Sequence, residues 1–339
     1  MNVEERFELI KRNTLEIITE EDLRTLLNEK KSPSVYIGRA TTGPLHLGHL
    51  IAIGKLFDFM NAGVEVKILL ADVHAALDDL KAKWEELDKR VEYTRKCIEL
   101  AFDWGDRKPV FVKGSDYQLN RDYLLDMLKM STITTVERAT RAASEVTRMK
   151  NPKVSELIYP IMQALDEQYL DVDIQLGGND QRHIFVFDRD YLPQLGYRKR
   201  VEVMTPLVAS LLGPGTKMSS SVPSSHIKVY DSEENLRKKI NSAYCPEGVV
   251  KDNLVLQMVK FLVFPMDGKF EVSRPQKFGG DAVFESYADM EKAFTDKKLH
   301  PADLKKALAE YLVARLAPAR EYFEKHRDVL EELGPEFLP

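Results

Sequence analysis

Short apolar runs alternate with longer amphipathic segments along the first two thirds of the chain. Residues 45–60 and 83–101 carry apolar positions at helical spacing. A continuous apolar run is typical of a strand buried on both faces of a parallel sheet, and regular alternation with helices favours right-handed connections. The pattern therefore predicts an α/β fold with strands at residues 35–37, 65–72, 109–113, 173–176 and 201–204.

Three parts of the chain depart from this alternation. Residues 1–31 have a charged, helical pattern. Residues 116–150 are polar and helical in pattern, without a strand, and this predicts an insertion between two halves of the sheet domain. Beyond residue 230 most of the chain is predicted to be helical, with one strand-like run at residues 269–273. We therefore expect a Rossmann-like parallel-sheet domain with a helical insertion, followed by a smaller, mainly α-helical domain.

Length and composition agree with this division. The chain has 339 residues, enough for two domains, which we place at residues 1–230 and 231–339. No apolar run approaches the ~20 residues that a membrane span needs, and the charged N-terminus does not resemble a signal peptide. Cys97 and Cys245 lie far apart and fit reduced thiols better than a disulfide. These features predict a cytoplasmic protein with no membrane association.

The net charge of −5 argues against a protein that coats nucleic acid without specificity. Local basic patches remain compatible with it. Residues 198–200 are Arg-Lys-Arg, and paired lysines occur at 238–239, 297–298 and 305–306. Each of these could contact nucleic acid or could belong to an ordinary solvated face.

The first candidate binding element is the Gly-rich turn within residues 34–49. Gly38 and Gly43 follow a short β-prone run and allow backbone conformations that are closed to larger residues. The spacing then places His46 and His49 in the first turns of a helix. Because a helix N-terminus presents unpaired N–H groups, and both histidines can donate to one anion, this element suits a phosphate.

The histidine pair is also compatible with two roles that involve no phosphate. His46 and His49 could form half of a metal site, although no Cys, Asp or Glu cluster nearby completes one. They could instead be ordinary histidines, since a motif of this length often matches by chance. A second group of phosphate-binding residues elsewhere in the chain would favour the anion site.

A polar stripe marks the helix predicted for residues 153–170. Tyr159, Gln163 and Asp166 follow one another at i, i+4 and i+7 and so share one helical face. The rest of the segment is mainly apolar, whereas a solvent-facing stripe would normally carry Lys and Glu. The stripe therefore favours a pocket that hydrogen-bonds a polar small molecule.

Further polar residues follow predicted strands. Asp72 and His74 come just past one strand, and Gln181 belongs to a second Gly-hinged turn at residues 177–182. Ligands of open parallel sheets gather at the carboxyl ends of the strands. We therefore expect these side chains near the same edge.

Residues 212–225 are rich in Gly, Pro and Ser and predict an exposed, mobile loop. Lys217 is a compact positive charge on a flexible stem, which suits a phosphate. The hydroxyls of Ser219, Ser220 and Ser221 can donate beside it. The alternative is a flexible linker with a solvated lysine.

Together these elements resemble the class I aminoacyl-tRNA synthetases. Pro-Leu-His-Leu-Gly-His at residues 44–49 is similar to the HIGH motif, and Lys-Met-Ser-Ser-Ser at residues 217–221 is similar to KMSKS. Ser220 stands where KMSKS has its second lysine. The finer resemblance, over roughly residues 5 to 325, is to tyrosyl-tRNA synthetases of the archaeal and eukaryotic cytoplasmic type. It is carried by residues 36–38, 70–74, 159–166, 177–182, 277–280 and 300–305.

The resemblance implies a two-step reaction. Tyrosine attacks the α-phosphate of ATP to give tyrosyl-adenylate and pyrophosphate, and the tyrosyl group then passes to the 3′ end of tRNA-Tyr. Such an enzyme positions its reactants and neutralises charge on the phosphates, so it needs no covalent intermediate. Mg²⁺ is expected to accompany ATP as substrate, with no metal held by the protein itself.

The resemblance also implies the small-molecule sites. Tyr36 and Asp166 match the positions that recognise the tyrosine hydroxyl, and Tyr159, Gln163 and Gln181 match those that hold its amino end. His74 completes the expected tyrosine-binding set. The implied ATP-binding residues are Gly38, His46, Gly48, His49, Lys217, Met218 and Ser220, and the implied catalytic residues are His46, His49, Lys217, Ser219 and Ser220.

For tRNA, Phe278, His300 and Asp303 match anticodon-reading positions, and Lys305 lies in the same segment. An aromatic ring for stacking and a carboxylate that accepts from guanine can together read an unstacked base. Arg182 and Arg141 match the family positions that lie near the first base pair of the acceptor stem. The insertion at residues 116–150 corresponds to the dimer-forming region of the family, so a homodimer is expected.

Three alternatives are retained. A tryptophanyl-tRNA synthetase would need an indole-shaped pocket without the hydroxyl clamp of Tyr36 and Asp166. A catalytically silent, RNA-binding relative would have no need of His46, His49 and Lys217. A general nucleotidyltransferase of the same fold would not need the segment at residues 300–305.

Overall fold

The computed structural model describes residues 1–147, 152–218 and 222–339. The chain forms two compact units. The first comprises Met1–Thr42, Asp58–Arg95 and Trp104–Leu207, and the second comprises Gly43–Phe57, Lys96–Asp103 and Val208–Pro339. The functional division near residue 230 remains a prediction.

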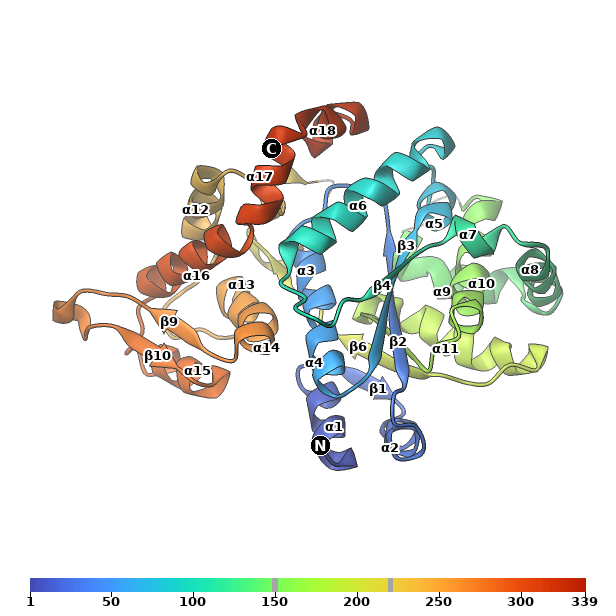
Figure 1. Cartoon of the computed structure of the whole chain (residues 1–339), viewed down its shortest axis with the longest axis horizontal. Coiled ribbons are helices and arrows are strands. Elements are labelled where there is room, and N and C mark those ends of the chain that lie inside the picture. Colours follow the sequence, from blue (N-terminus) through green and yellow to red (C-terminus); the bar gives the residue numbers. More distant parts are fainter. Residues whose placement is uncertain (148–151, 219–221) are drawn as a thin grey trace. The chain divides into compact units, whose positions relative to one another are not determined.

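The first unit is built on a six-stranded sheet with the order β1-β6-β5-β2-β3-β4 (Figure 1). The strands are β1 (Glu16–Ile18), β2 (Ser34–Ala40), β3 (Glu65–Ala71), β4 (Val110–Lys113), β5 (Ile174–Gly178) and β6 (Val201–Thr205). Strands β2 to β6 pair in parallel, as the alternating pattern predicts, and β1 pairs antiparallel with β6. The mixed sheet confirms the predicted α/β class.

The N-terminal segment differs from its predicted helical pattern. Two helices, α1 (Val3–Lys11) and α2 (Glu20–Glu29), flank the three-residue strand β1. Its register pairs Glu16 with Met204 and Ile18 with Glu202. Strand β1 covers the edge of β6 that would otherwise be open. This long-range pairing cannot be predicted from the three residues of β1 alone.

The helices of the first unit provide the crossover connections and a helical layer. The crossover between β3 and β4 includes α5 (Asp72–Leu77) and α6 (Leu87–Ala101). The predicted insertion is helical where it is described, with α7 (Ser115–Gln118), α8 (Arg121–Ile133) and α9 (Val136–Thr147). Figure 1 shows α8 and α9 beside α10 (Val154–Tyr169) and α11 (Arg182–Tyr191), and buried apolar residues from these helices form one cluster.

The second unit is mainly helical. It includes α3 (Leu47–Gly54), which a break at Lys55 separates from α4 (Leu56–Asn61), where one helix was predicted. The other main helices are α12 (Glu233–Ser242), α13 (Leu254–Met258), α14 (Phe264–Asp267), α15 (Tyr287–Thr295), α16 (Pro301–Arg315), α17 (Ala317–Lys325) and α18 (Arg327–Leu333). The predicted strand at residues 269–273 is β9 (Phe270–Val272), which pairs with β10 (Ala282–Phe284).

The segment predicted as an exposed loop at residues 212–225 has structure of its own. Strands β7 (Ala209–Ser210) and β8 (Gly213–Lys217) form an antiparallel hairpin. Gly213 and Gly215 have φ values of +98° and +81°, a region that favours glycine. Glycines that suggested an unstructured loop are therefore what allows the tight hairpin.

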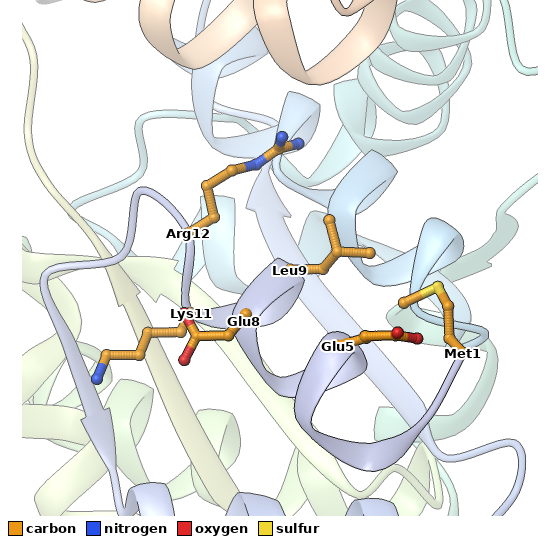
Figure 2. Close-up of a pocket in the computed structure, with 6 residues that line it drawn as sticks. All are labelled: Met1, Glu5, Glu8, Leu9, Lys11 and Arg12. Atoms are coloured by element: carbon orange, nitrogen blue, oxygen red, sulfur yellow. The ribbon is translucent and has the colours of Figure 1, made fainter. Parts of the chain in front are cut away.

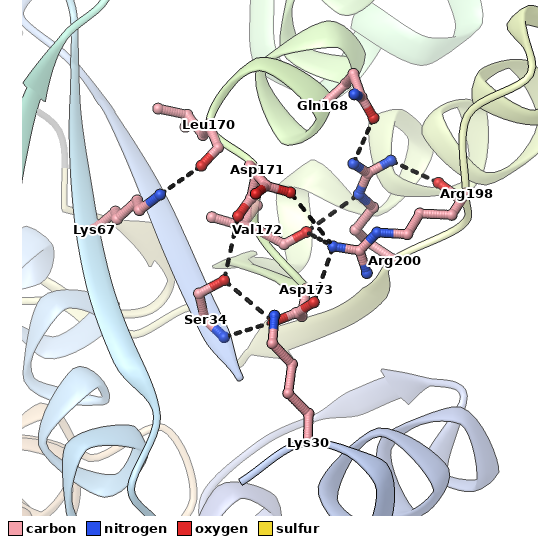
Figure 3. Close-up of polar contacts among 10 residues, drawn as sticks. All are labelled: Lys30, Ser34, Lys67, Gln168, Leu170, Asp171, Val172, Asp173, Arg198 and Arg200. Carbon is pink, nitrogen blue, oxygen red and sulfur yellow. Dashed lines mark hydrogen bonds and ion pairs between the residues drawn. The ribbon is translucent and has the colours of Figure 1, made fainter. Parts of the chain in front are cut away.

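Two of the arginines predicted as a basic patch or a solvated face make intramolecular hydrogen bonds (Figure 3). Arg198 donates to Val172 O at 2.9 Å and pairs with Asp173 at 2.9 Å. Arg200 is buried and donates to Gln168 Oε1 at 2.7 Å. These bonds tie the approach to β6 to the segment between α10 and β5. Arg200 is therefore buried and structural, whereas Arg198 is 48% exposed and stays compatible with the predicted solvated face.

Candidate active site

Asp166 lies at the centre of a buried polar group in the first unit. It projects from α10, and only 1% of its surface is exposed. Tyr117 Oη and Gln118 Nε2 each donate to Asp166 Oδ1 at 2.8 Å, and Tyr123 Oη lies 2.9 Å from the same oxygen. Burial raises the pKa of this carboxyl to about 7, while these donors act in the opposite direction.

The second carboxyl oxygen of Asp166 is different. Within the described residues, Oδ2 is buried and accepts no hydrogen bond, and His74 Nε2 lies 3.7 Å from it. Gln118 Nε2 lies 3.4 Å from His74 Nδ1. If Gln118 donates to Nδ1, the proton of the neutral His74 ring lies on the other ring nitrogen, His74 Nε2. Burial lowers the pKa of His74 to about 4, so the ring is neutral. A buried acceptor of this kind suits a ligand that brings its own donor.

Tyr36 belongs to the same buried group. Its hydroxyl lies 2.7 Å from the side-chain amide of Gln175 and 3.5 Å from Gln163 O. Burial and the nearby charge of Asp166 raise the pKa of Tyr36 well above its usual value, so its hydroxyl stays protonated. The structure therefore places the Tyr36 hydroxyl next to Gln163 on α10, the helix that also carries Asp166.

The amide and aromatic residues predicted for the other end of the substrate also converge. Gln163 Nε2 donates to Gln181 Oε1 at 3.1 Å, which joins α10 to the turn after β5. The ring of Tyr159 packs edge-on against His74 with centroids 4.7 Å apart. The predicted stripe of α10 thus faces the carboxyl ends of the strands, where polar ligands bind in parallel sheets.

The histidine pair lies at the start of α3 in the second unit. His46 is the N-cap residue, and its backbone N–H donates to His49 Nδ1 at 3.3 Å. The two rings stack with centroids 3.6 Å apart. His226, which sequence reasoning missed, places its ring 4.9 Å from that of His46. Three imidazoles therefore gather at one helix N-terminus, an arrangement suited to anionic phosphate oxygens.

The two signature motifs meet at Gly48. A Cβ atom at this position would come within 3.1 Å of both the His46 ring and Met218 Sδ, so a larger residue would require these side chains to shift. Lys217 ends β8, and its backbone pairs with Ala209. Ser219, Ser220 and Ser221 lie outside the described residues, so their assigned roles remain predictions. Gly38, the other glycine assigned to ATP, lies on β2 near Tyr36 and has room beside it.

The predicted anticodon-reading residues lie on neighbouring turns of the second unit. Phe278 is 58% exposed, and Lys277 Nζ lies 4.9 Å from its ring centroid. His300 caps α16 by accepting from Ala302 N at 3.1 Å. Arg274 links the two turns, because it donates to Gly280 O at 2.6 Å and to Lys298 O at 2.7 Å.

The other candidate tRNA-binding residues are placed as follows. Asp303 lies in the first turn of α16. Lys305 donates to Asn241 O at 3.0 Å, so a contact between Lys305 and tRNA would have to coexist with this intramolecular hydrogen bond. Arg182 begins α11 and forms a two-pronged ion pair with Glu16 at 2.7 and 2.9 Å. Arg141 lies exposed on α9.

Two surface hollows lie away from these groups. One, of about 660 Å³, follows α1 and is lined by Met1, Glu5, Glu8, Leu9, Lys11 and Arg12 (Figure 2). The other, of about 210 Å³, is lined by Asp173 and Arg200, which directly precede β5 and β6. Neither is lined by a residue that the sequence assigned to the site.

The described residues hold neither a metal cluster nor a membrane-spanning helix. Across residues 1–147, 152–218 and 222–339, no three His, Cys, Asp or Glu side chains gather in a way that could hold a metal ion. No helix in that part of the chain is both long and apolar enough to cross a membrane.

Sequence reasoning missed several members of the site. Tyr117, Gln118 and Tyr123 were placed in the insertion without a role, yet all three surround Asp166. Gln175 carried the clearest signal, because a glutamine between Ile174 and Leu176 in a buried strand must find a polar partner.

Comparison with known proteins identifies the fold. The family model described as "tRNA synthetases class I (W and Y)" matches residues 28–317. The tyrosine–tRNA ligase of Archaeoglobus fulgidus is 44% identical over 95% of this chain and 98% of its own length. The cytoplasmic tyrosine–tRNA ligase of Danio rerio is 43% identical over 96% of this chain and 61% of its own length.

Solved structures agree with the sequence matches. The crystal structure of A. fulgidus tyrosyl-tRNA synthetase complexed with L-tyrosine aligns with a TM-score of 0.89, over 94% of this chain and 99% of that one, at 44% identity. A tryptophanyl-tRNA synthetase from Aeropyrum pernix aligns with a TM-score of 0.69 at 18% identity, covering 94% of this chain and 85% of that one, which supports a shared fold and no more.

Proposed function

This chain belongs to the class I tRNA synthetase family for tryptophan and tyrosine, and we infer that it joins tyrosine to tRNA. The observation that carries the choice of tyrosine is the buried Oδ2 of Asp166, which has no hydrogen bond within the described residues and lies in the same group as Tyr36. A phenol hydroxyl supplies the missing donor. A phenyl ring has no donor to offer there. An indole has only its ring N–H, and the 44% identity to a tyrosine–tRNA ligase favours tyrosine over tryptophan.

The proposed first step activates tyrosine. The substrate carboxylate attacks the α-phosphate of ATP, an oxygen–phosphorus bond forms, and pyrophosphate leaves. Gln163, Gln181 and Tyr159 orient the amino end of tyrosine, so that the carboxylate is presented to the phosphate. His46 and His49 donate to phosphate oxygens as negative charge develops, helped by the N-terminus of α3. Lys217 supplies a further positive charge, and Mg²⁺ enters as part of the ATP substrate.

The second step transfers the tyrosyl group to tRNA. A hydroxyl of the 3′-terminal ribose attacks the activated carbonyl, and AMP leaves. The anticodon is recognised in this proposal by Phe278, His300 and Asp303, whose turns Arg274 connects. An exposed aromatic ring and a nearby carboxylate suit a splayed-out base. The protein is expected in the cytoplasm, the compartment named for the Danio rerio relative.

The experiment that tests this function is amino-acid-dependent ATP–pyrophosphate exchange, run in parallel with tyrosine, tryptophan and phenylalanine. Exchange with tyrosine alone is the expected result. Exchange with tryptophan would keep the mechanism and refute the pocket assignment. No exchange from folded protein would favour the RNA-binding relative that lacks catalysis.

Replacing His300 with alanine is expected to weaken tRNA charging about tenfold and to leave pyrophosphate exchange unchanged. The variant removes a base contact as well as the N-cap of α16, and a lost cap costs about 1 kcal/mol. His300→Asn separates these effects, because asparagine caps a helix well but does not replace the ring. Equal loss of exchange and charging in either folded variant would give the second unit another role.

The homodimer proposal rests on apolar side chains of the insertion. Leu124, Leu125, Leu128, Ile133 and Val136 are all exposed, and Leu128 and Val136 are 57% and 69% exposed. Large apolar side chains gathered on α8 and the start of α9 are typical of a protein–protein interface.

A Leu128→Glu variant is therefore expected to sediment as a monomer at concentrations where the original chain is dimeric. A charge placed in the centre of a dry interface has no partner and opposes association. Analytical ultracentrifugation measures the change, and Val110→Glu, at another exposed apolar position on β4, is the matched control. A dimer that survives Leu128→Glu would exclude this surface.

A further inference from the structure

A short segment at residues 227–229 pairs with the start of α3 through its backbone. Two hydrogen bonds, of 3.0 and 3.1 Å, join residues 45–47 to residues 227–229. Between these bonds His46 lies opposite Lys228 in an antiparallel bridge. Both stretches belong to the second unit. The backbone of His46, the N-cap residue of α3, is therefore held in place by residues 227–229.

Residues 227–229 are held in turn by a segment at residues 334–338. Lys228 Nζ donates to Leu338 O, and Tyr230 Oη donates to Phe337 O at 2.7 Å. Lys228 and Tyr230 are both buried, and a buried ammonium or hydroxyl group needs an acceptor. Two consecutive backbone carbonyls provide these acceptors. The residue that lies opposite His46 is thus fixed by a part of the chain that has no role in the proposed function.

The segment at residues 334–338 has its own anchor. It contains η7 (Pro335–Phe337), in which Phe337 N donates to Gly334 O at 3.1 Å. Only 1% of the Phe337 surface is exposed, and burial of a phenyl ring stabilises the position of its backbone. The carbonyl groups of this turn are therefore held where Lys228 and Tyr230 can donate to them.

The backbone of residues 227–229 has a second, independent support. Lys228 N donates to Asp231 Oδ2 at 3.1 Å, and Lys239 Nζ donates to the same oxygen at 2.6 Å. Because the first of these bonds uses the backbone of Lys228, a change of its side chain leaves the bond intact. The contact with residues 334–338 can thus be removed without removing the whole support of residues 227–229.

The same stretch of chain carries the third imidazole of the candidate phosphate site. His226 directly precedes residues 227–229, and its ring centroid lies 4.9 Å from that of His46. The ring of His49 stacks on the other histidine at 3.6 Å. A displacement of residues 227–229 would move His46 through the paired backbone and His226 through the chain itself. Donors displaced in this way stabilise a developing charge less well.

We propose that residues 334–338, acting through Lys228 and Tyr230, position His46 and His226 for the phosphates of ATP. The inference rests on the proposed function and adds positioning residues that do not themselves touch the substrate. All of these contacts lie within the second unit, whereas the residues proposed to hold tyrosine belong to the first. Loss of the contact is therefore expected to slow the reaction and to leave tyrosine binding unchanged.

A Lys228→Met variant is expected to lower kcat of tyrosine-dependent pyrophosphate exchange about tenfold, because the phosphate donors are displaced. The dissociation constant of tyrosine, measured by equilibrium dialysis, is expected to stay within about twofold. Lys228→Arg is expected to recover most of the lost rate, since a guanidinium group can also donate to a carbonyl oxygen.

Lys67→Met is the matched control for the lysine variant. Lys67 Nζ likewise donates to a backbone carbonyl, Leu170 O at 2.6 Å, but Lys67 lies in the first unit (Figure 3). Its replacement is expected to keep kcat within about twofold of the original value. A fall in kcat as large as that of Lys228→Met would show that the loss of any such lysine contact slows the reaction, and would overturn the proposal.

Phe337→Ala tests the same contact from its other side. Removal of the buried ring releases residues 334–338, so kcat is expected to fall as in Lys228→Met. If both variants act through one contact, their combination loses no more than about threefold beyond either alone, whereas independent effects multiply. Phe294→Ala removes an equally buried ring from α15 and is expected to lower the unfolding temperature without lowering kcat.

Circular dichroism and thermal unfolding verify that each variant folds at the assay temperature. If Phe337→Ala does not fold, Tyr230→Phe replaces it in the cycle. That variant loses the hydrogen bond to Phe337 O but keeps its ring, whose centroid lies 4.8 Å from that of Phe323. Its kcat is expected to fall in the same direction by about threefold, and less than additively with Lys228→Met.

The outcomes are distinct from failure of the proposed function. Absence of tyrosine-dependent exchange in the original chain would refute the function itself. With normal exchange in the original chain, an unchanged kcat in folded Lys228→Met would overturn the positioning role alone. A loss confined to Lys228→Met, with normal kcat in Tyr230→Phe and Phe337→Ala, would also overturn it, because Lys228 would then act without residues 334–338. A loss of tyrosine affinity in proportion to kcat would contradict an effect limited to the phosphate site.

Discussion

An Asp166→Ala variant is expected to lose tyrosine-dependent pyrophosphate exchange by about 10²-fold or more in kcat/KM. In the proposed function the carboxyl group offers Oδ2 to the substrate, and Tyr117, Gln118 and Tyr123 lie within 2.9 Å of Oδ1. A hydrogen bond to a charged group contributes roughly 1.5–3 kcal/mol, and each 1.4 kcal/mol is a factor of ten. Tyr117 and Gln118, which lose this acceptor, add to the loss by disturbing the pocket, whereas Tyr123 keeps Met162 O at 2.7 Å.

The matched control for Asp166 is Asp126. This carboxyl is also buried in the first unit and accepts from two tyrosines, Tyr169 at 2.9 Å and Tyr197. Asp126→Ala is expected to lower the thermal unfolding temperature to a similar degree while keeping tyrosine-dependent exchange. Unchanged exchange kinetics in folded Asp166→Ala would refute the assignment of the hydroxyl site.

A His49→Ala variant is expected to lower kcat of the exchange reaction about 10²-fold while tyrosine binds with unchanged affinity. His49 is placed to donate to phosphate oxygens as charge develops, and the loss of one such donor typically costs 10²–10³-fold. The residues proposed to hold tyrosine belong to the first unit, and His49 belongs to the second. Equilibrium dialysis with tyrosine and exchange kinetics with ATP measure the two effects separately.

His326→Ala is the matched control for the histidine variant. His326 is an exposed histidine of the second unit that packs against Tyr322 with ring centroids 4.3 Å apart. Its removal is expected to leave exchange unchanged. The His49 side chain also accepts from His46 N, so a fall in thermal stability is expected with His49→Ala. A variant that lost tyrosine binding in proportion to kcat would contradict a role confined to the phosphates.

Several features of this protein followed from local pattern. The five parallel strands were predicted near their observed positions, because buried strands need continuous apolar runs. The stripe of Tyr159, Gln163 and Asp166 was predicted on one helical face, since helical spacing alone decides which residues share a face. The placement of His46 and His49 at a helix N-terminus was also confirmed, because glycine-rich turns and helix starts have local signatures.

Other features were not predicted from the sequence, because they depend on contacts between distant parts of the chain. Strand β1 exists because β6 has an edge for it to pair with, and the hairpin at Lys217 exists because two glycines adopt positive φ values. Arg200 looked like a surface charge but is buried and donates to backbone and amide oxygens of a segment 28 to 32 positions earlier in the chain. The meeting of Gly48 with Met218 likewise required the folded second unit.

The sequence by itself determined the class of fold, the helical faces, the two signature motifs and, through them, the family. Only the tertiary structure decided which oxygen of Asp166 is hydrogen-bonded within the protein and how the Gln175 amide is oriented. Asp166 has three neighbours on one oxygen and, among the described residues, none within hydrogen-bonding distance on the other, and Gln175 is oriented by carboxyl groups from α10 and α11. Hydrogen-bond direction depends on which donors and acceptors face one another across the core. That pairing is a property of three-dimensional proximity, which no local pattern of residues encodes.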